Sequence, residues 1–73
     1  MSDEQLLERI SINPEVMLGK PVIKGTRVTV EYVIDRITHG ASIDDLIQEY
    51  EGIIRDDILA CQLFAQKFPS YNS

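Results

Sequence analysis

The feature of the sequence that most constrains its fold is a change in hydrophobic period near Thr29. Before this residue the apolar side chains alternate at a spacing of roughly two, and after it they recur at about 3.6, the period of a helix with one buried face. Residues 1–28 are therefore predicted to be an extended arm and residues 29–68 a helical bundle. Residues 69–73 are expected to form a loose tail. A chain of 73 residues is expected to fold as one domain.

Two short strands are predicted within the arm. Residues 10–12 alternate between apolar and polar and end at an Asn-Pro pair, which favours a turn. Residues 22–28 are predicted to form the second strand, with a bulge at Gly25, and to pair with the first as a β-hairpin. The pattern leaves open whether Leu6 and Leu7 begin the first strand or form a frayed helical turn. Because a two-stranded hairpin is barely stable in water, it must pack on the helices or on another chain.

Three helices are predicted in residues 29–68, because the boundaries between the apolar stripes carry capping or turn residues. These residues are, in chain order, Thr29, Gly40, Ser42, Gly52 and Pro69. Ser42 and Asp45 resemble a capping box at the start of the second helix. The third helix is expected to begin near Ile54.

Three short helices behind a hairpin indicate a mainly α fold. We expect a three-helix, homeodomain-like helix-turn-helix bundle with an N-terminal β-hairpin, in which the second and third helices form the motif. A structural or protein-binding bundle fits the same pattern. The third helix begins with Arg55, Asp56 and Asp57. Two carboxylates at this point disfavour a phosphate-lined groove but stabilise a helix N-terminus.

The basic residues are unevenly placed along a chain whose net charge is -5 at pH 7. Lys20, Lys24 and Arg27 lie close together, and no acidic residue interrupts residues 19–28. We expect these three side chains, together with Arg55, to be candidate contacts for DNA phosphates, because Lys and Arg supply most of the affinity for nucleic acid. The alternative is that the three form a solvated strand edge.

Residues 58–65, on the third predicted helix, are hydrophobic nearly all round. In so small a domain the core covers only one side of such a helix. We therefore expect Leu59, Leu63 and Phe64 to contribute to a homo-oligomer or partner interface. The alternative is that the N-terminal hairpin covers them.

The sequence offers little for enzymatic chemistry, and we predict no catalytic residue, no metal site and no cofactor. His39, the only histidine, is expected to interact with the end of a helix, and Cys61, the only cysteine, to be a core residue. No apolar run is long enough to cross a bilayer, and the acidic N-terminus does not resemble a signal peptide. A cytoplasmic protein is therefore expected.

Two stretches of the sequence, residues 10–15 and 19–31, closely resemble the signature of the bacterial domain of unknown function 433 family. The similarity covers about residues 6–67, although Glu51 stands where the family usually has proline and Ile54 where it has a capping Thr or Ser. The resemblance implies a homeodomain-like helix-turn-helix domain with an antitoxin-like role. Such a protein would bind DNA and pair with a PIN-like ribonuclease toxin. The alternative is a purely protein-binding inhibitor or adaptor that does not bind DNA.

Overall fold

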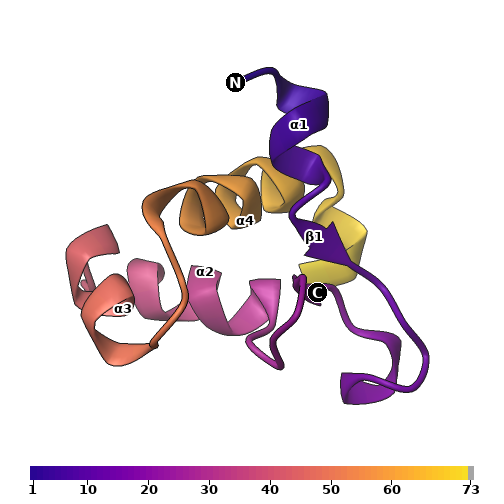
Figure 1. Cartoon of the computed structure of the whole chain (residues 1–73), viewed down its shortest axis with the longest axis horizontal. Helices are drawn as coiled ribbons and strands as arrows, with labels where there is room; N and C mark the ends of the chain where they lie inside the picture. Colours follow the sequence, from indigo (N-terminus) through magenta and orange to yellow (C-terminus); the bar gives the residue numbers. More distant parts are fainter. Residues whose placement is uncertain (73) are drawn as a thin grey trace.

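The structure, a computed structural model, describes residues 1–72. Within these residues the chain forms four α-helices, a two-stranded antiparallel sheet and two turns of 3-10 helix (Figure 1). The elements are, in chain order, α1 (Asp3–Leu7), β1 (Ile10–Ser11), η1 (Met17–Gly19), β2 (Val22–Ile23), α2 (Val30–Thr38), α3 (Ile43–Glu49), α4 (Arg55–Lys67) and η2 (Pro69–Asn72). The expectation of a mainly α fold with an N-terminal hairpin is confirmed at this level.

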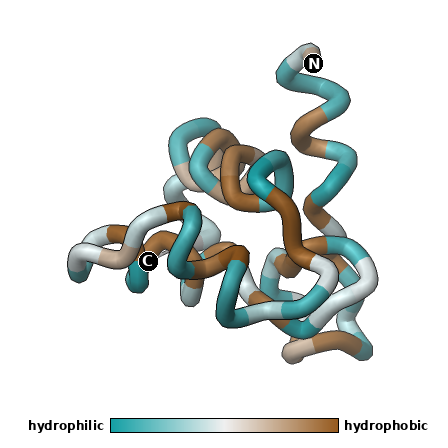
Figure 2. The backbone as a smooth tube through the Cα atoms, turned by 60° about the vertical axis from the view of Figure 1, so that its left-hand side comes forward, coloured by the Kyte–Doolittle hydropathy of each residue, from teal (hydrophilic) through white to brown (hydrophobic). Residues whose placement is uncertain are grey.

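The core lies between α2, α3 and α4, with β2 closing one end. Most of its buried apolar side chains come from the stripes that repeat at helical spacing, while Ile23 belongs to β2 and Ile53 to the connection before α4. Figure 2 shows hydrophobic and hydrophilic residues alternating along the helices. The buried apolar residues of the core are Ile23, Val30, Val33, Leu46, Ile53, Ile58, Cys61 and Phe64. Most of the core therefore comes from residues after Thr29, as the change of hydrophobic period predicts, although α1 lies before this residue and packs against α4.

The predicted helix boundaries are confirmed by short-range hydrogen bonds. Thr29 Oγ1 accepts from the Tyr32 amide at 3.0 Å and caps α2. Gly40, with φ of +100°, lies just after the end of this helix, where a left-handed residue is favoured. At the start of α3, Ser42 Oγ accepts from the Asp45 amide at 3.0 Å and Asp45 Oδ2 accepts from the Ser42 amide at 2.9 Å. Such caps form within a few residues, which is why the sequence pattern reveals them.

The hairpin is shorter than expected. β1 and β2 pair as predicted, with Ile10 opposite Ile23, but the second strand ends at Ile23. The expected bulge at Gly25 is wrong. Gly25 has φ of +81° and lies in a tight turn that is closed by the Thr26 amide donating to the Ile23 carbonyl at 2.9 Å. The chain then folds back, and the Val28 carbonyl accepts from the Ile23 amide at 2.9 Å. A glycine with positive φ serves a reversal of the chain as readily as it serves a bulge.

The first residues are helical, although residues 1–28 were expected to be extended. Ser2 and Gln5 form a capping box, in which Ser2 Oγ accepts from the Gln5 amide at 3.2 Å and Gln5 Oε1 accepts from the Ser2 amide at 2.9 Å. Acidic residues in the first turn add to this signal for a helix start. The helical alternative for Leu6 and Leu7 is the one that the structure shows in part, since both lie within or at the end of α1, which packs against α4.

Residues 69–72 are also ordered differently from the expectation of a loose tail. They form η2, and the Tyr71 ring centroid lies 5.5 Å from that of Phe64 and 6.5 Å from that of Phe68. Contacts between three aromatic rings hold this turn against the end of α4. Residue 73 falls outside the described residues.

Candidate binding surfaces

Among residues 1–72 the buried polar and charged side chains are those of Thr29 and Asp57. No group of three or more His, Cys, Asp and Glu side chains in this part of the chain is placed to hold a metal ion. No helix among the same residues is long and apolar enough to span a membrane. Cys61 is fully buried, and burial raises the pKa of its thiol to about 12, so the thiol is neutral and shielded from solvent. The hollows and grooves of the structure are open to solvent, and the candidate sites below lie among them.

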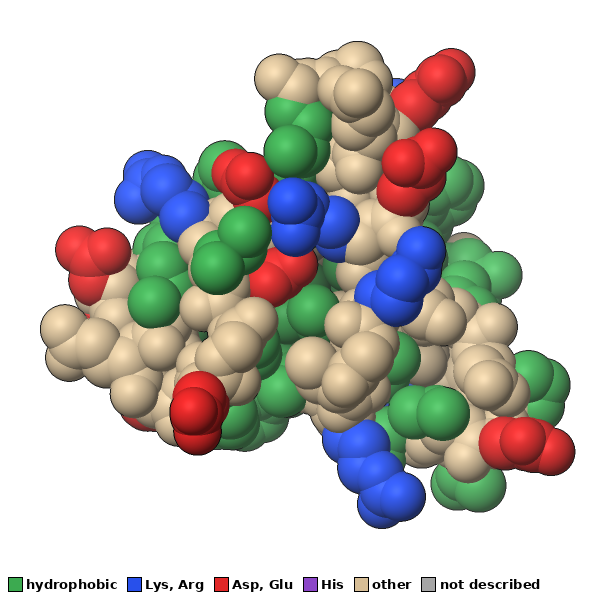
Figure 3. Space-filling model, in the orientation of Figure 1, with side chains coloured by type: hydrophobic (Ala, Val, Ile, Leu, Met, Phe, Trp, Pro, Cys, Tyr) green, Lys and Arg blue, Asp and Glu red, His purple; other side chains and the backbone are tan. Residues whose placement is uncertain are grey.

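The four basic side chains expected to contact phosphates do not gather in one place. Lys20 Nζ lies 3.5 Å from Glu31 Oε2, so its charge is partly neutralised. Lys24 lines an open hollow of about 730 Å³, whereas Arg27 lines two others and Arg55 begins α4. Figure 3 shows Lys and Arg side chains scattered over one face and interleaved with Asp and Glu. Among residues 1–72, Lys24, Arg27 and Arg55 have no acidic partner.

Arg9 and Asp57 form a contact that the sequence pattern did not reveal. Asp57 is only 7% exposed and accepts from Arg9 Nη1 at 3.1 Å and from the Ile54 amide at 3.0 Å. The second bond confirms that an acid in the first turn stabilises the start of α4, where the N-cap residue Ile54 has no polar side chain. The position of Asp57 gave a signal for this role, but nothing in the sequence indicated its distant partner Arg9.

The three residues of the candidate interface on α4 differ in their exposure to solvent. Phe64 is only 6% exposed and belongs to the core, and its ring centroid lies 5.0 Å from that of Phe68, so it offers little surface to a partner. Leu59 and Leu63 are half-buried, and α1 and β1 pack against α4. The nearly all-round hydrophobic surface of α4 does not indicate which side is covered in the fold. The N-terminal segment covers part of that surface. An interface through Leu59 and Leu63 stays a prediction.

The loop of residues 16–19 carries the most exposed large apolar side chain among the described residues. Leu18 is 94% exposed and Met17 is 42% exposed. Both have left-handed backbone angles, with φ of 59° and 49°. For residues other than glycine this conformation costs roughly 1 to 2 kcal/mol each. The sequence gave no signal for it, apart from Gly19 at the end of the turn, which also has a positive φ.

Met17 also borders an open groove of about 370 Å³ between the 16–19 loop and the helices. The groove is lined mainly by carbon atoms, and its other residues are Arg27, Val28, Thr29, Tyr32 and Tyr50. The rings of Tyr32 and Tyr50 meet edge to face, with centroids 6.1 Å apart. Both tyrosines line the same concave surface. The sequence pattern identified Tyr50 only as part of the apolar stripe of a helix.

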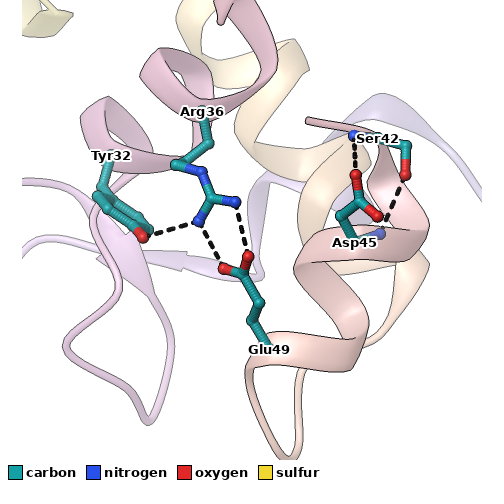
Figure 4. A network of polar contacts seen from close by, with 5 residues as sticks. All are labelled: Tyr32, Arg36, Ser42, Asp45 and Glu49. Atoms are coloured by element: carbon teal, nitrogen blue, oxygen red, sulfur yellow. Dashed lines mark hydrogen bonds and ion pairs between the residues drawn. The ribbon is translucent and has the colours of Figure 1, made fainter. Parts of the chain in front are cut away.

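A polar network fixes one wall of this groove (Figure 4). Arg36 Nη1 donates to the Tyr32 hydroxyl at 3.0 Å, and Arg36 Nη2 donates to Glu49 Oε1 at 2.6 Å. These bonds join α2 to α3 and hold the pKa of the Glu49 carboxyl below its usual value. They also raise the pKa of Arg36, whose guanidinium is charged at any physiological pH. The Tyr32 ring is thereby held in one orientation.

The protein is a small, mainly helical domain with a two-stranded antiparallel sheet. Its candidate binding features are the exposed 16–19 loop and the groove beside it. The chain belongs to the family described as "Protein of unknown function (DUF433)", whose model matches residues 10–65. The family expected from the sequence is thus confirmed. A crystal structure described as a member of that family, from Anabaena variabilis ATCC 29413, is similar with a TM-score of 0.83 and 27% sequence identity. The similarity covers 92% of this chain and 66% of that chain, slightly less than two thirds. No curated protein matches.

Proposed function

We propose that this chain is an antitoxin-like, protein-binding inhibitor whose partner is a protein with a basic surface. The observation that carries the proposal is the charge left after the ion pairs of the fold are made. Four of the seven Lys and Arg side chains contact acids of the same chain, namely Arg9, Lys20, Arg36 and Lys67. These contacts use five of the twelve Asp and Glu residues. Seven acids and three bases remain without such partners in the described chain, which favours a basic protein over phosphates.

The start of α4 supports the same choice. In a helix-turn-helix protein the first residues of the second helix face the base edges of DNA. Here α4 begins with Arg55, but Asp56 and Asp57 follow, and the Asp57 carboxylate is held against the protein. In addition, α1 packs against α4 and covers part of the surface of that helix. The family resemblance implies a PIN-like ribonuclease as the partner, and an acidic inhibitor would bind a basic surface of such an enzyme.

The test is capture of the tagged full-length chain from its native host, with bound proteins identified by mass spectrometry and bound nucleic acid by sequencing. We expect one basic protein to be retained at low salt and to be released as salt screens the contact. Retention of DNA without any protein would overturn the proposal. A ribonuclease assay on the captured protein, with and without the chain, then measures inhibition.

A second candidate function is DNA binding by a homeodomain-like helix-turn-helix formed by α3 and α4. The observation that favours it is that Lys24, Arg27 and Arg55 have no acidic partner among residues 1–72. Replacing one phosphate-binding side chain with alanine should lower the slope of log affinity against log salt by about one. Equal DNA binding by the triple alanine variant would dismiss these residues. Lys20 is a weaker candidate, because it already contacts Glu31.

Self-association is a further part of the proposal, because Leu59 and Leu63 are only half-buried in the single chain. We expect the chain to form a homo-oligomer, and the mass in solution at low micromolar concentration measures this. A monomer at that concentration that also retains no partner protein would remove Leu59 and Leu63 from the candidate interface residues.

A further inference from the structure

The 16–19 loop is built in a way that does not serve the stability of the fold. Leu18 contributes almost no burial, yet its backbone and that of Met17 are held in the left-handed region. The loop is nevertheless well formed, since the Gly19 amide donates to the Val16 carbonyl at 3.1 Å and the Lys20 amide to the Met17 carbonyl at 3.2 Å. Figure 1 shows the turn η1 projecting from the body of the molecule. An apolar side chain is thus held in water by a preformed turn, which lowers the entropy cost of binding.

The loop is continuous with concave surface on the helices. Met17 lines the groove that contains Tyr32 and Tyr50, and it also lines a neighbouring hollow of about 260 Å³. One surface therefore carries both a projecting apolar side chain, Leu18, and a groove lined by two tyrosines. Tyrosines of this kind often dominate binding energies, because a rigid amphipathic ring loses little entropy when it is buried.

Acids outnumber bases around this surface, although Arg27, which has no acidic partner among residues 1–72, lines the groove itself. The neighbouring hollow is lined by Glu31 and Asp35, and its one base, Lys20, already contacts Glu31 at 3.5 Å. Glu15, which directly precedes the loop in the sequence, is exposed and has no Lys or Arg partner in the described chain. Two copies meeting through this surface would bring acidic margins together, which is unfavourable. A different protein with basic residues around its contact is the better occupant.

We propose that the 16–19 loop and the Tyr32–Tyr50 groove form the docking surface for a protein partner that offers an apolar pocket rimmed by Lys and Arg. This inference rests on the proposed protein-binding function and adds the surface and the chemistry of the partner. Leu18 enters the apolar pocket of the partner. A side chain of the partner fills the groove beside Tyr32. The acids at the margin contact the basic rim.

Two matched substitutions test the surface. Leu18→Asn removes the apolar side chain but keeps the backbone, because asparagine tolerates the left-handed region better than leucine does. Ile54→Asn makes the same change at a half-exposed apolar position at the start of α4, far from the loop (Figure 1). Asparagine is also a favoured N-cap residue, so this control is expected to fold at least as well as the original chain. The thermal unfolding of both variants is measured first.

The probe is the purified protein that the original full-length chain retains in the capture experiment. We expect Leu18→Asn to weaken its binding on the order of tenfold or more, and Ile54→Asn to leave it within about twofold. A photo-crosslinking amino acid at position 18 should join the chain to this same protein, and one at position 54 should not. We also expect high salt to weaken the complex, because the basic rim of the partner faces acids.

Three results would overturn the inference, and they separate it from the proposed function. Equal binding of the retained protein by Leu18→Asn would mean that the partner docks elsewhere, while the protein-binding function stands. Crosslinking of position 18 to a second copy of the chain would make the surface a self-association site. Retention of no protein at all would remove both the function and the surface.

Discussion

The ion pair between Arg9 and Asp57 joins residues 48 positions apart and connects the N-terminal segment to the start of α4. We expect Arg9→Met to lower the free energy of unfolding by about 1 to 2 kcal/mol. A hydrogen bond to a charged group contributes about 1.5 to 3 kcal/mol, but the Arg9 side chain is 32% exposed, so solvent screening reduces the effect. Methionine keeps the alkyl packing of the arginine stem. Asp57 would be left with the Ile54 amide as its remaining hydrogen-bond donor.

Equilibrium unfolding in urea, followed by far-UV circular dichroism, measures this change. Lys67→Met is the matched control, because it removes an exposed contact of 3.9 Å with Asp3 and should cost only about 0 to 0.5 kcal/mol. For a domain of this size the Arg9 variant should also melt about 5 to 15 °C lower. Asp57→Asn keeps an acceptor for the Ile54 amide, and the double variant isolates the energy of the pair. If Arg9→Met and Lys67→Met agree within about 0.3 kcal/mol, the pair does not hold the N-terminal segment in place.

Four further outcomes are expected. Leu18→Gly should raise the free energy of unfolding by about 0.5 to 1 kcal/mol, because glycine adopts the left-handed conformation without steric cost. The control Gln66→Gly, within α4, should lower the free energy of unfolding by about 1 kcal/mol. Urea unfolding of the two variants measures this difference in sign. Burial raises the pKa of the Cys61 thiol from 9.0 to about 12, so the native protein should react with a thiol reagent only after unfolding. The folded state holds this proton more tightly, so the stability it contributes is complete below pH 9.0 and should be lost as the pH rises toward about 12, which unfolding measured across this range tests. Arg36→Met should return the lowered pKa of Glu49 toward 4.5, as carboxyl titration by NMR would show.

The parts of the fold that could be predicted are those decided within a few residues. Thr29 caps α2 through the amide three positions later, and Ser42 and Asp45 cap α3 through each other, so the residues that form each cap stand together in the sequence. Residues 2–5 carry an equally local signal for a helix start, whereas the strand pattern of residues 10–12 that follows them favours an extended segment. Gly25 shows the limit of such reasoning, because its positive φ fits both a bulge and a turn.

The parts that could not be predicted depend on contacts between distant residues. The apolar girdle of α4 does not specify which side α1 covers, so the sequence alone places Phe64 and Leu59 in the same candidate interface although only Phe64 is buried. Arg9 has no sequence feature that identifies Asp57 as its partner. The exposure of Leu18 is of the same kind, because a leucine in a loop is usually buried by neighbours that the sequence does not place.

The two candidate functions use largely separate surfaces, so single substitutions can test each function separately. Lys24 lies in a hollow beside Arg9, whereas Leu18 and Tyr32 belong to the docking surface. Arg27 is shared, because it is a candidate phosphate contact and also lines the groove. A Lys24→Ala variant should therefore affect only DNA binding, Leu18→Asn only protein binding, and Arg27→Ala both. Abolished DNA binding in Leu18→Asn would mean that the two surfaces act as one, because an uncharged side chain makes no ionic phosphate contact of its own.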